Sequence, residues 1–138
     1  MRLLRRLAVV VATTVLMFSV LASFSAASSE KAFHLNKTCS IPGALCTVQW
    51  SDFKAIPAGT DITYTWGSAT IAYPTIVVRN GSTTGVCDWA QPASGAVRAK
   101  CTFDGGTGRL TQFHLAVDVT HVGTVWYWDG VYWSGNGD

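Results

Sequence analysis

A strict two-residue alternation around a glycine-rich segment constrains the fold of this chain more than any other feature. Apolar residues stand at every second position on both sides of residues 104–108, at Val97, Ala99, Cys101, Phe103, Phe113, Leu115, Val117 and Val119. The segment between them begins DGGTG, and glycine reaches positive φ at little steric cost, as tight turns require. Because a helix would repeat its apolar residues every three or four positions, this period predicts paired strands, each with one buried face.

Similar runs, rich in β-branched and aromatic residues and bounded by turn residues, occupy most of the chain after residue 39. They cover residues 45–52, 61–66, 75–79, 83–89 and 125–133. Asn80-Gly81 is a strong hairpin-turn signal, and Asp129-Gly130, inside the last run, predicts a bulge or bend. About seven strands at regular spacing, with no helix after the N-terminal segment, predict an all-β fold with a single antiparallel β-barrel; a β-sandwich is the alternative.

The first 27 residues have the layout of a secretory signal peptide. Three arginines precede an apolar run at residues 7–21, and small residues at 25–27 match the positions that signal peptidase reads. An uncleaved membrane anchor is the competing interpretation, because the uncharged run is long enough to span a bilayer. We expect a cleaved signal helix over residues 1–27, a flexible tail over 28–38 and a secreted domain over 39–138, with no membrane contact after cleavage.

The charge of the exported part argues against one class of partner. The whole chain has 10 Lys and Arg residues against 8 Asp and Glu residues. Cleavage would remove three arginines and no acid, which leaves seven basic and eight acidic residues. Because no basic stripe is left, we expect no binding of nucleic acid.

All four cysteines, Cys39, Cys46, Cys87 and Cys101, lie in the exported part of the chain. Four cysteines allow three pairings. We expect disulfides Cys39–Cys46 and Cys87–Cys101, because each pair is close in sequence and encloses a turn-rich loop in an oxidising compartment. The alternative, a zinc site, does not match the spacing, which lacks the short cysteine pairs typical of structural zinc. We therefore predict no metal and no other cofactor.

The segment FDGGTGRL at residues 103–110 resembles a hairpin of the allene oxide cyclase and dirigent-type barrels, and especially that of small uncharacterised secreted bacterial proteins with a GGTGR hairpin. The sequences QFH at 112–114 and WDGVY at 128–132 are similar to the late strands of those proteins. The resemblance covers mainly residues 97–133. It implies an eight-stranded antiparallel barrel with an apolar cavity, in which the eighth strand would lie near residues 69–73. It carries over no catalytic residue.

Catalytic motifs are not evident in the sequence. His114 and Asp118 lie on one side of a predicted strand, but four residues along a strand span about 13 Å, too far for a hydrogen bond. No Gly-x-Ser-x-Gly occurs, and the aspartates show no spacing that favours a catalytic pair. The glycine-rich turn is followed by a strand, whereas nucleotide-binding loops need a helix. We therefore expect no catalytic residue.

Aromatic residues are the most suggestive candidates for a function. The chain has six tryptophans, and in the last predicted strand Trp126 and Trp128 share one face while Tyr127 and Trp133 share the other. Some of these rings must therefore meet solvent, a cavity or a partner. The candidate ligand-binding residues are Trp66, Trp126, Trp128, Tyr64, Tyr132 and His114.

The sequence thus predicts a secreted barrel that binds a small apolar molecule or a glycan through aromatic residues, rather than an enzyme. One alternative is a barrel-type cyclase or isomerase, whose cavity positions an apolar substrate. The other is an extracellular interaction or inhibitor domain. A deep apolar pocket with one His or Asp would favour the enzyme. A flat row of exposed tryptophans would favour glycan binding, and a filled barrel would favour the interaction domain.

Overall fold

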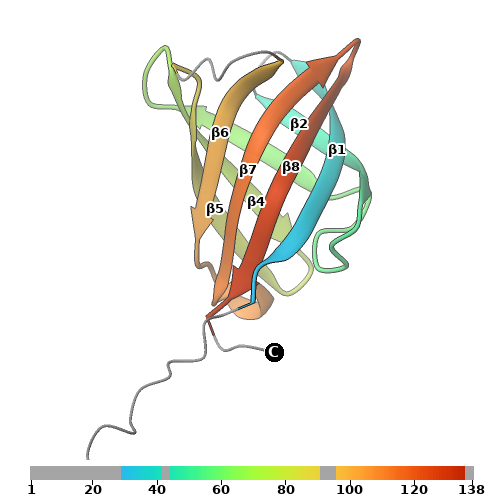
Figure 1. The fold of residues 1–138 in the computed structure, drawn as a ribbon, viewed down its shortest axis with the longest axis vertical. Helices are drawn as coiled ribbons and strands as arrows, with labels where there is room; N and C mark the ends of the chain where they lie inside the picture. The colour runs from blue at the N-terminus through green and yellow to red at the C-terminus, as the bar shows by residue number, and fades with distance from the viewer. Residues whose placement is uncertain (1–28, 42–43, 91–95, 136–138) are drawn as a thin grey trace, which may run out of the picture.

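A computed structural model describes residues 29–41, 44–90 and 96–135 of the 138-residue chain. These residues form a closed antiparallel barrel in which each strand pairs with the next and β8 pairs with β1 (Figure 1). The strands are β1 (Lys31–Ile41), β2 (Leu45–Ser51), β3 (Asp61–Trp66), β4 (Ile71–Val78), β5 (Gly81–Asp88), β6 (Val97–Asp104), β7 (Phe113–Val122) and β8 (Val125–Ser134). The predicted barrel is confirmed, and the sandwich is excluded.

The N-terminal segment expected to be a signal helix lies outside the described residues. Among the residues that the structure does describe, no helix is long and apolar enough to cross a membrane.

Strand β1 corrects the prediction of a flexible tail over residues 28–38. From Lys31 onward the chain is a strand that pairs with β8 on one side and with β2 on the other. Its inward residues Phe33 and Leu35 are fully buried, and its polar residues mostly face outward. The eighth strand that the resemblance implies is therefore β1, at the start of the barrel. No separate strand forms near residues 69–73, and residues 71–73 are instead the start of β4.

The predicted bulge at Asp129-Gly130 is also corrected. Strand β8 pairs with β7 without a shift of register from Val125 to Ser134. Gly130 instead allows the backbones of β8 and β7 to lie close together, because a Cβ atom there would lie 2.0 Å from the carbonyl oxygen of Ala116 on β7. Glycine within a strand often marks such an approach rather than a bulge.

The glycine-rich connection between β6 and β7 contains a 3₁₀ turn, η1 (Gly108–Leu110), that closes one end of the barrel. It packs on the β4–β5 turn, where the backbone N–H of Arg109 donates to the carbonyl of Asn80 at 2.8 Å. Gly108 has φ +57°, and a Cβ atom on it would lie 2.0 Å from the Asn80 oxygen, so only glycine fits there. Leu110 is fully buried beneath this contact.

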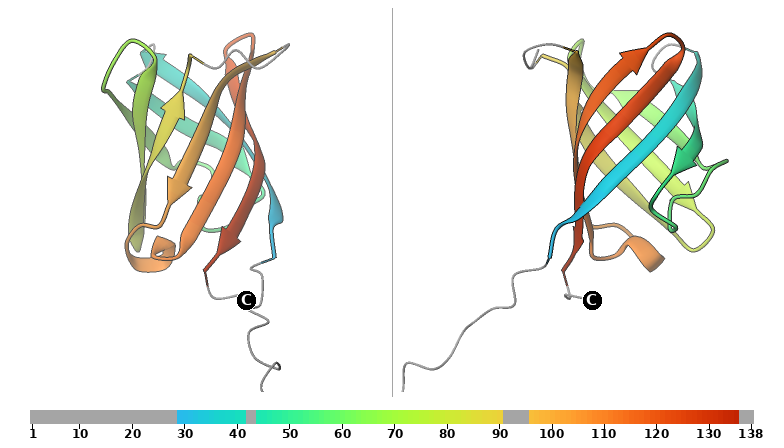
Figure 2. Two further views of the ribbon diagram at one scale, coloured as in Figure 1. Left: turned by 60° about the vertical axis from the view of Figure 1, so that its left-hand side comes forward. Right: turned by 45° about the vertical axis from the view of Figure 1, so that its right-hand side comes forward.

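The two ends of the barrel differ. Figure 2 shows η1 at the end where the N-terminal strand enters and β8 leaves, and we call this the closed end. The opposite end, which we call the mouth, is where β3 leads into β4 and the β7–β8 hairpin turns. Toward the closed end the interior is filled by apolar side chains, all at most 4% exposed: Phe33, Leu35, Ile56, Phe103, Leu110, Phe113 and Leu115.

Both expected disulfides are present. Cys39–Cys46 joins β1 to β2, and Cys87–Cys101 joins β5 to β6, each between residues directly opposite one another. Cys46, Cys87 and Cys101 are at most 2% exposed, so these cross-links lie on the inner face of the barrel wall.

Candidate functional site

A cavity of about 490 Å³ opens at the mouth of the barrel. Its walls come from β1, β2, β3 and β7, from the residue after β5, and from the start of β8. The lining residues are Lys37, Cys39, Cys46, Tyr64, Trp66, Trp89, Val119, His121, Gly123, Thr124 and Trp126. The walls are therefore mainly aromatic and apolar, and one side is open to solvent.

A row of aromatic side chains forms one wall of this cavity. Trp66 and Trp89 have ring centroids 5.9 Å apart, and Trp89 meets Trp126 edge to face at 5.7 Å. His121 stacks on Trp126 with centroids 3.9 Å apart, which extends the row onto β7. Alternation turns the rings on β3, β7 and β8 inward, and Trp89 follows directly after β5. Ring contacts of this kind stabilise aromatic clusters.

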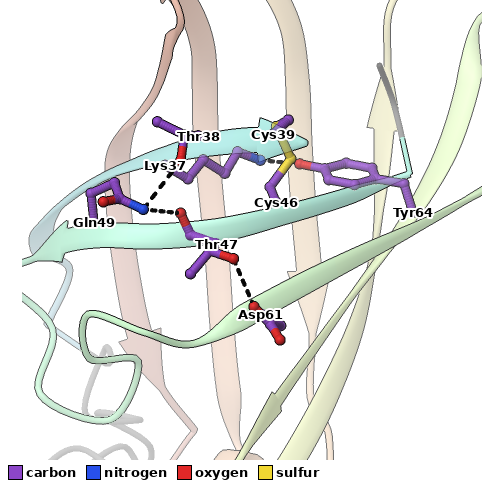
Figure 3. Close-up of a disulfide and its surroundings, with 8 residues drawn as sticks. All are labelled: Lys37, Thr38, Cys39, Cys46, Thr47, Gln49, Asp61 and Tyr64. Atoms are coloured by element: carbon purple, nitrogen blue, oxygen red, sulfur yellow. Dashed lines mark hydrogen bonds between the residues drawn. A yellow bond between two sulfur atoms is a disulfide. The ribbon is translucent and has the colours of Figure 1, made fainter. Parts of the chain in front are cut away.

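A buried amine lies deeper in the cavity. Lys37 follows Phe33 and Leu35 on the inward face of β1 and is only 2% exposed. Its Nζ atom is hydrogen-bonded to the hydroxyl of Tyr64, which comes from β3. Figure 3 shows the Lys37 side chain and the Tyr64 ring pointing toward each other across the barrel interior, with the Cys39–Cys46 disulfide in the same region.

The surroundings of this amine are apolar. Nζ lies 3.9 Å from the ring centroid of Trp128, which is fully buried, and 4.6 Å from that of Tyr64. No carboxylate of the described residues forms an ion pair with Lys37. The amine therefore has one hydroxyl partner and two aromatic faces, but no counter-charge within the part of the chain that the structure describes.

Burial governs the protonation of both groups. It holds the pKa of Lys37 well below its ordinary value of 10.5, because removal from water penalises the ammonium form. It raises the pKa of Tyr64 above its ordinary value for the same reason, which keeps the phenol protonated. The face of Trp128 favours the ammonium form by about 2 kcal/mol, but desolvation of an ion costs several kcal/mol, so burial sets the direction in which the pKa of Lys37 moves.

Three of the predicted ligand-binding residues line the cavity. Tyr64, Trp66 and Trp126 come together there although they are widely separated in the sequence. Trp128 lies directly against Lys37 and fills the barrel below it. The prediction that Trp126 and Trp128 share one face is confirmed, since both rings contact interior residues.

The structure places the other two predicted residues elsewhere. Tyr132 packs against Phe53 near the closed end, with ring centroids 4.6 Å apart. His114 lies on the outer surface, where its Nδ1 is 2.5 Å from Asp104 and its ring stacks on Trp133 at 5.4 Å.

Sequence reasoning missed Lys37, Trp89 and His121. A signal for Lys37 was present, because it continues the alternation of Phe33 and Leu35 toward Cys39, and a lysine at an inward position breaks that pattern. The expectation of a tail concealed it. Among the described residues, no group of three or more His, Cys, Asp or Glu side chains is placed to hold a metal ion.

Comparisons with known proteins returned no significant match to the chain among protein-family models, curated proteins or solved structures. The resemblance to allene oxide cyclase and dirigent-type proteins therefore stays a prediction.

Proposed function

We propose that this protein is an extracellular carrier or receptor that binds a small, largely apolar molecule in the cavity at the barrel mouth. The observation that carries the proposal is the cavity itself: about 490 Å³, walled by Tyr64, Trp66, Trp89 and Trp126, with one buried amine at depth. Ligand sites in proteins commonly have this size and this mixture of apolar walls with few polar groups. The two disulfides support an extracellular setting.

A glycan is less well supported as the ligand. Glycan binding through stacking favours several tryptophans exposed side by side. Here the two most exposed tryptophans are Trp50 and Trp66, at 52% and 44%. Trp50 stands near the end of β2 that is remote from the mouth. At the mouth, the neighbours of Trp66 in the aromatic row are half-buried, so the row is not a flat, exposed surface.

The cyclase or isomerase alternative has less support than binding. Such an enzyme needs a cavity that excludes water and holds an acid or base against the substrate. This cavity is open on one side. Its lining contains one histidine, His121, whose ring is stacked on Trp126, and no carboxylic acid that could act with it.

The proposal is tested by titrating the oxidised protein with octan-1-ol while following intrinsic tryptophan fluorescence. We expect a saturable change, because the rings of Trp66, Trp89 and Trp126 line the site. Trp66→Leu should weaken binding by about tenfold, from the apolar contact that is lost. Trp50→Leu is the matched control and should leave binding unchanged.

Two outcomes would overturn the proposal. The first is a saturable response to a hexasaccharide such as chitohexaose with none to octan-1-ol, which would identify a glycan site. The second is no response to either, which would favour a protein partner.

A further inference from the structure

Lys37 is difficult to explain as a structural residue. An amine at 2% exposure destabilises a barrel interior unless it is well satisfied, and an apolar side chain of similar length would fill the same space at less cost. Of the described residues, only Tyr64 hydrogen-bonds its Nζ. The disulfide two residues along β1 and the packed rings around Nζ would hold the strand in place without it.

Lys37 contributes to the wall of the cavity although it is only 2% exposed. Lys37 and Tyr64 both belong to the lining, and the walls beside them are apolar. A molecule that enters past the aromatic row and reaches the part of the cavity lined by Lys37 and Tyr64 would meet a primary amine hydrogen-bonded to a phenol. The wall also contains Trp89, whose buried indole N–H has no hydrogen-bond partner among the described residues.

We propose that Lys37 captures an apolar aldehyde or ketone as an imine, which would make the protein a covalent but reversible carbonyl-binding barrel. This inference rests on the proposed function, since it concerns the same cavity and specifies the chemical class of its ligand.

The reaction balances without an oxidant or a second reactant. The lone pair of the neutral Nζ attacks the carbonyl carbon, the C=O π bond breaks, and a proton moves from nitrogen to oxygen to give a carbinolamine. Loss of that oxygen as water, with a second proton from nitrogen, breaks the C–O bond and forms the C=N bond. Tyr64, already hydrogen-bonded to Nζ, is positioned to relay these protons.

The environment suits a carbonyl better than an anion. An anionic ligand would require a cation, and the lining contains no arginine and no lysine besides Lys37. Burial disfavours the ammonium form of that one lysine and so favours the form that attacks carbonyls. The other lysines, Lys31, Lys54 and Lys100, are exposed.

The test uses octanal, which matches octan-1-ol in chain length but carries a carbonyl. The oxidised protein is incubated with octanal and sodium cyanoborohydride, which reduces an imine to a stable secondary amine, and the alkylated residues are located by peptide mass mapping. We expect one octyl group at Lys37, formed at least tenfold faster than at Lys31, Lys54 or Lys100. Lys37→Met should lose this adduct and keep the slow background at the other three lysines.

Tyr64→Phe provides a second, independent readout. It removes the proton relay but keeps the ring, so Lys37 should still be alkylated, at a lower rate. Far-ultraviolet circular dichroism and a melting curve establish that each variant is folded.

Each remaining outcome is decisive. Labelling of Lys37 no faster than of the exposed lysines would overturn the inference. If octan-1-ol and octanal bind equally and Lys37 is not alkylated, the carbonyl inference fails while the proposed function stands. If neither compound binds, both fail.

Discussion

Replacing Lys37 with methionine should change how the stability of the protein depends on pH, and the size of the effect follows from one proton. Burial keeps the pKa of the folded amine well below 10.5, whereas the unfolded chain exposes it to water. At pH values between the pKa of Lys37 in the folded protein and its ordinary pKa, the amine is unprotonated in the folded state and protonated in the unfolded state. The unfolded state therefore binds one more proton at this site. Because stability rises with pH wherever the unfolded state binds more protons, the wild type should gain about 1.4 kcal/mol per pH unit in that window.

Methionine at this position is apolar, similar in length and does not titrate. The Lys37→Met protein should therefore lack this slope and be the more stable of the two at the lower end of the window. Urea unfolding of both oxidised proteins, followed by tryptophan fluorescence at about pH 8 and about pH 9.5, measures the difference. We expect the advantage of the variant to shrink by about 2 kcal/mol over that interval, since other titrating groups cancel in the comparison.

Lys100→Met is the matched control. Lys100 is exposed and pairs with Asp118 at 3.0 Å on the outer surface, so its replacement should leave the pH dependence close to that of the wild type. Parallel stability profiles for the wild type and Lys37→Met would refute the reasoning, because they would mean that Lys37 keeps its proton inside the barrel.

Three further predictions concern the barrel wall. The double variant Cys87→Ala/Cys101→Ala should lose about 3 kcal/mol in urea unfolding, from the loop of chain that the disulfide closes, and an unchanged midpoint would contradict this. Gly130→Ala should lower the free energy of unfolding by about 2 kcal/mol or more in the same assay, because the added Cβ would lie 2.0 Å from a β7 carbonyl oxygen. A variant as stable as the wild type would show that β7 and β8 can move apart there without cost. The hydrogen bond that His34 donates to the Asp129 carboxylate raises the pKa of the histidine. This pair therefore stabilises the fold below the ordinary histidine pKa, and the contribution is lost as pH rises through the folded pKa. Asp129→Asn should therefore be slightly less stable than the wild type near pH 5 and nearly equal near pH 8, and an equal loss at both would disprove the linkage.

The barrel itself could be predicted because its strands show alternation and its turns carry glycine. The strand at Asp61–Trp66 was predicted to the residue, and those at β7 and β8 nearly so. Strand β1 was missed because its outward residues are polar and its inward face contains a lysine. The role of Gly130 was misjudged because a close approach between neighbouring strands leaves no trace in a single strand's sequence.

The candidate site was less accessible to sequence reasoning. Tyr64, Trp66 and Trp126 were selected as aromatic residues, but nothing in the sequence places them around one cavity with Trp89. Their meeting depends on the stagger of strands in a closed barrel, which a list of alternating residues does not specify. His114 and His121 illustrate the same limit, since the parity of β7 puts one on each face and only the structure shows that the inward one lines the mouth.

The position of Lys37 within the barrel gives a physical reason to treat it as functional. Natural sequences break local rules mostly where function requires it, and the rest of the fold compensates. Here the closed end is filled with apolar side chains and capped by η1, and the disulfide Cys39–Cys46 fixes β1 beside the lysine. A frame of this rigidity can tolerate one unfavourable amine and hold it in a constant place. An amine that is buried, has a lowered pKa and is held against Tyr64 suits the reversible capture of a carbonyl that we propose.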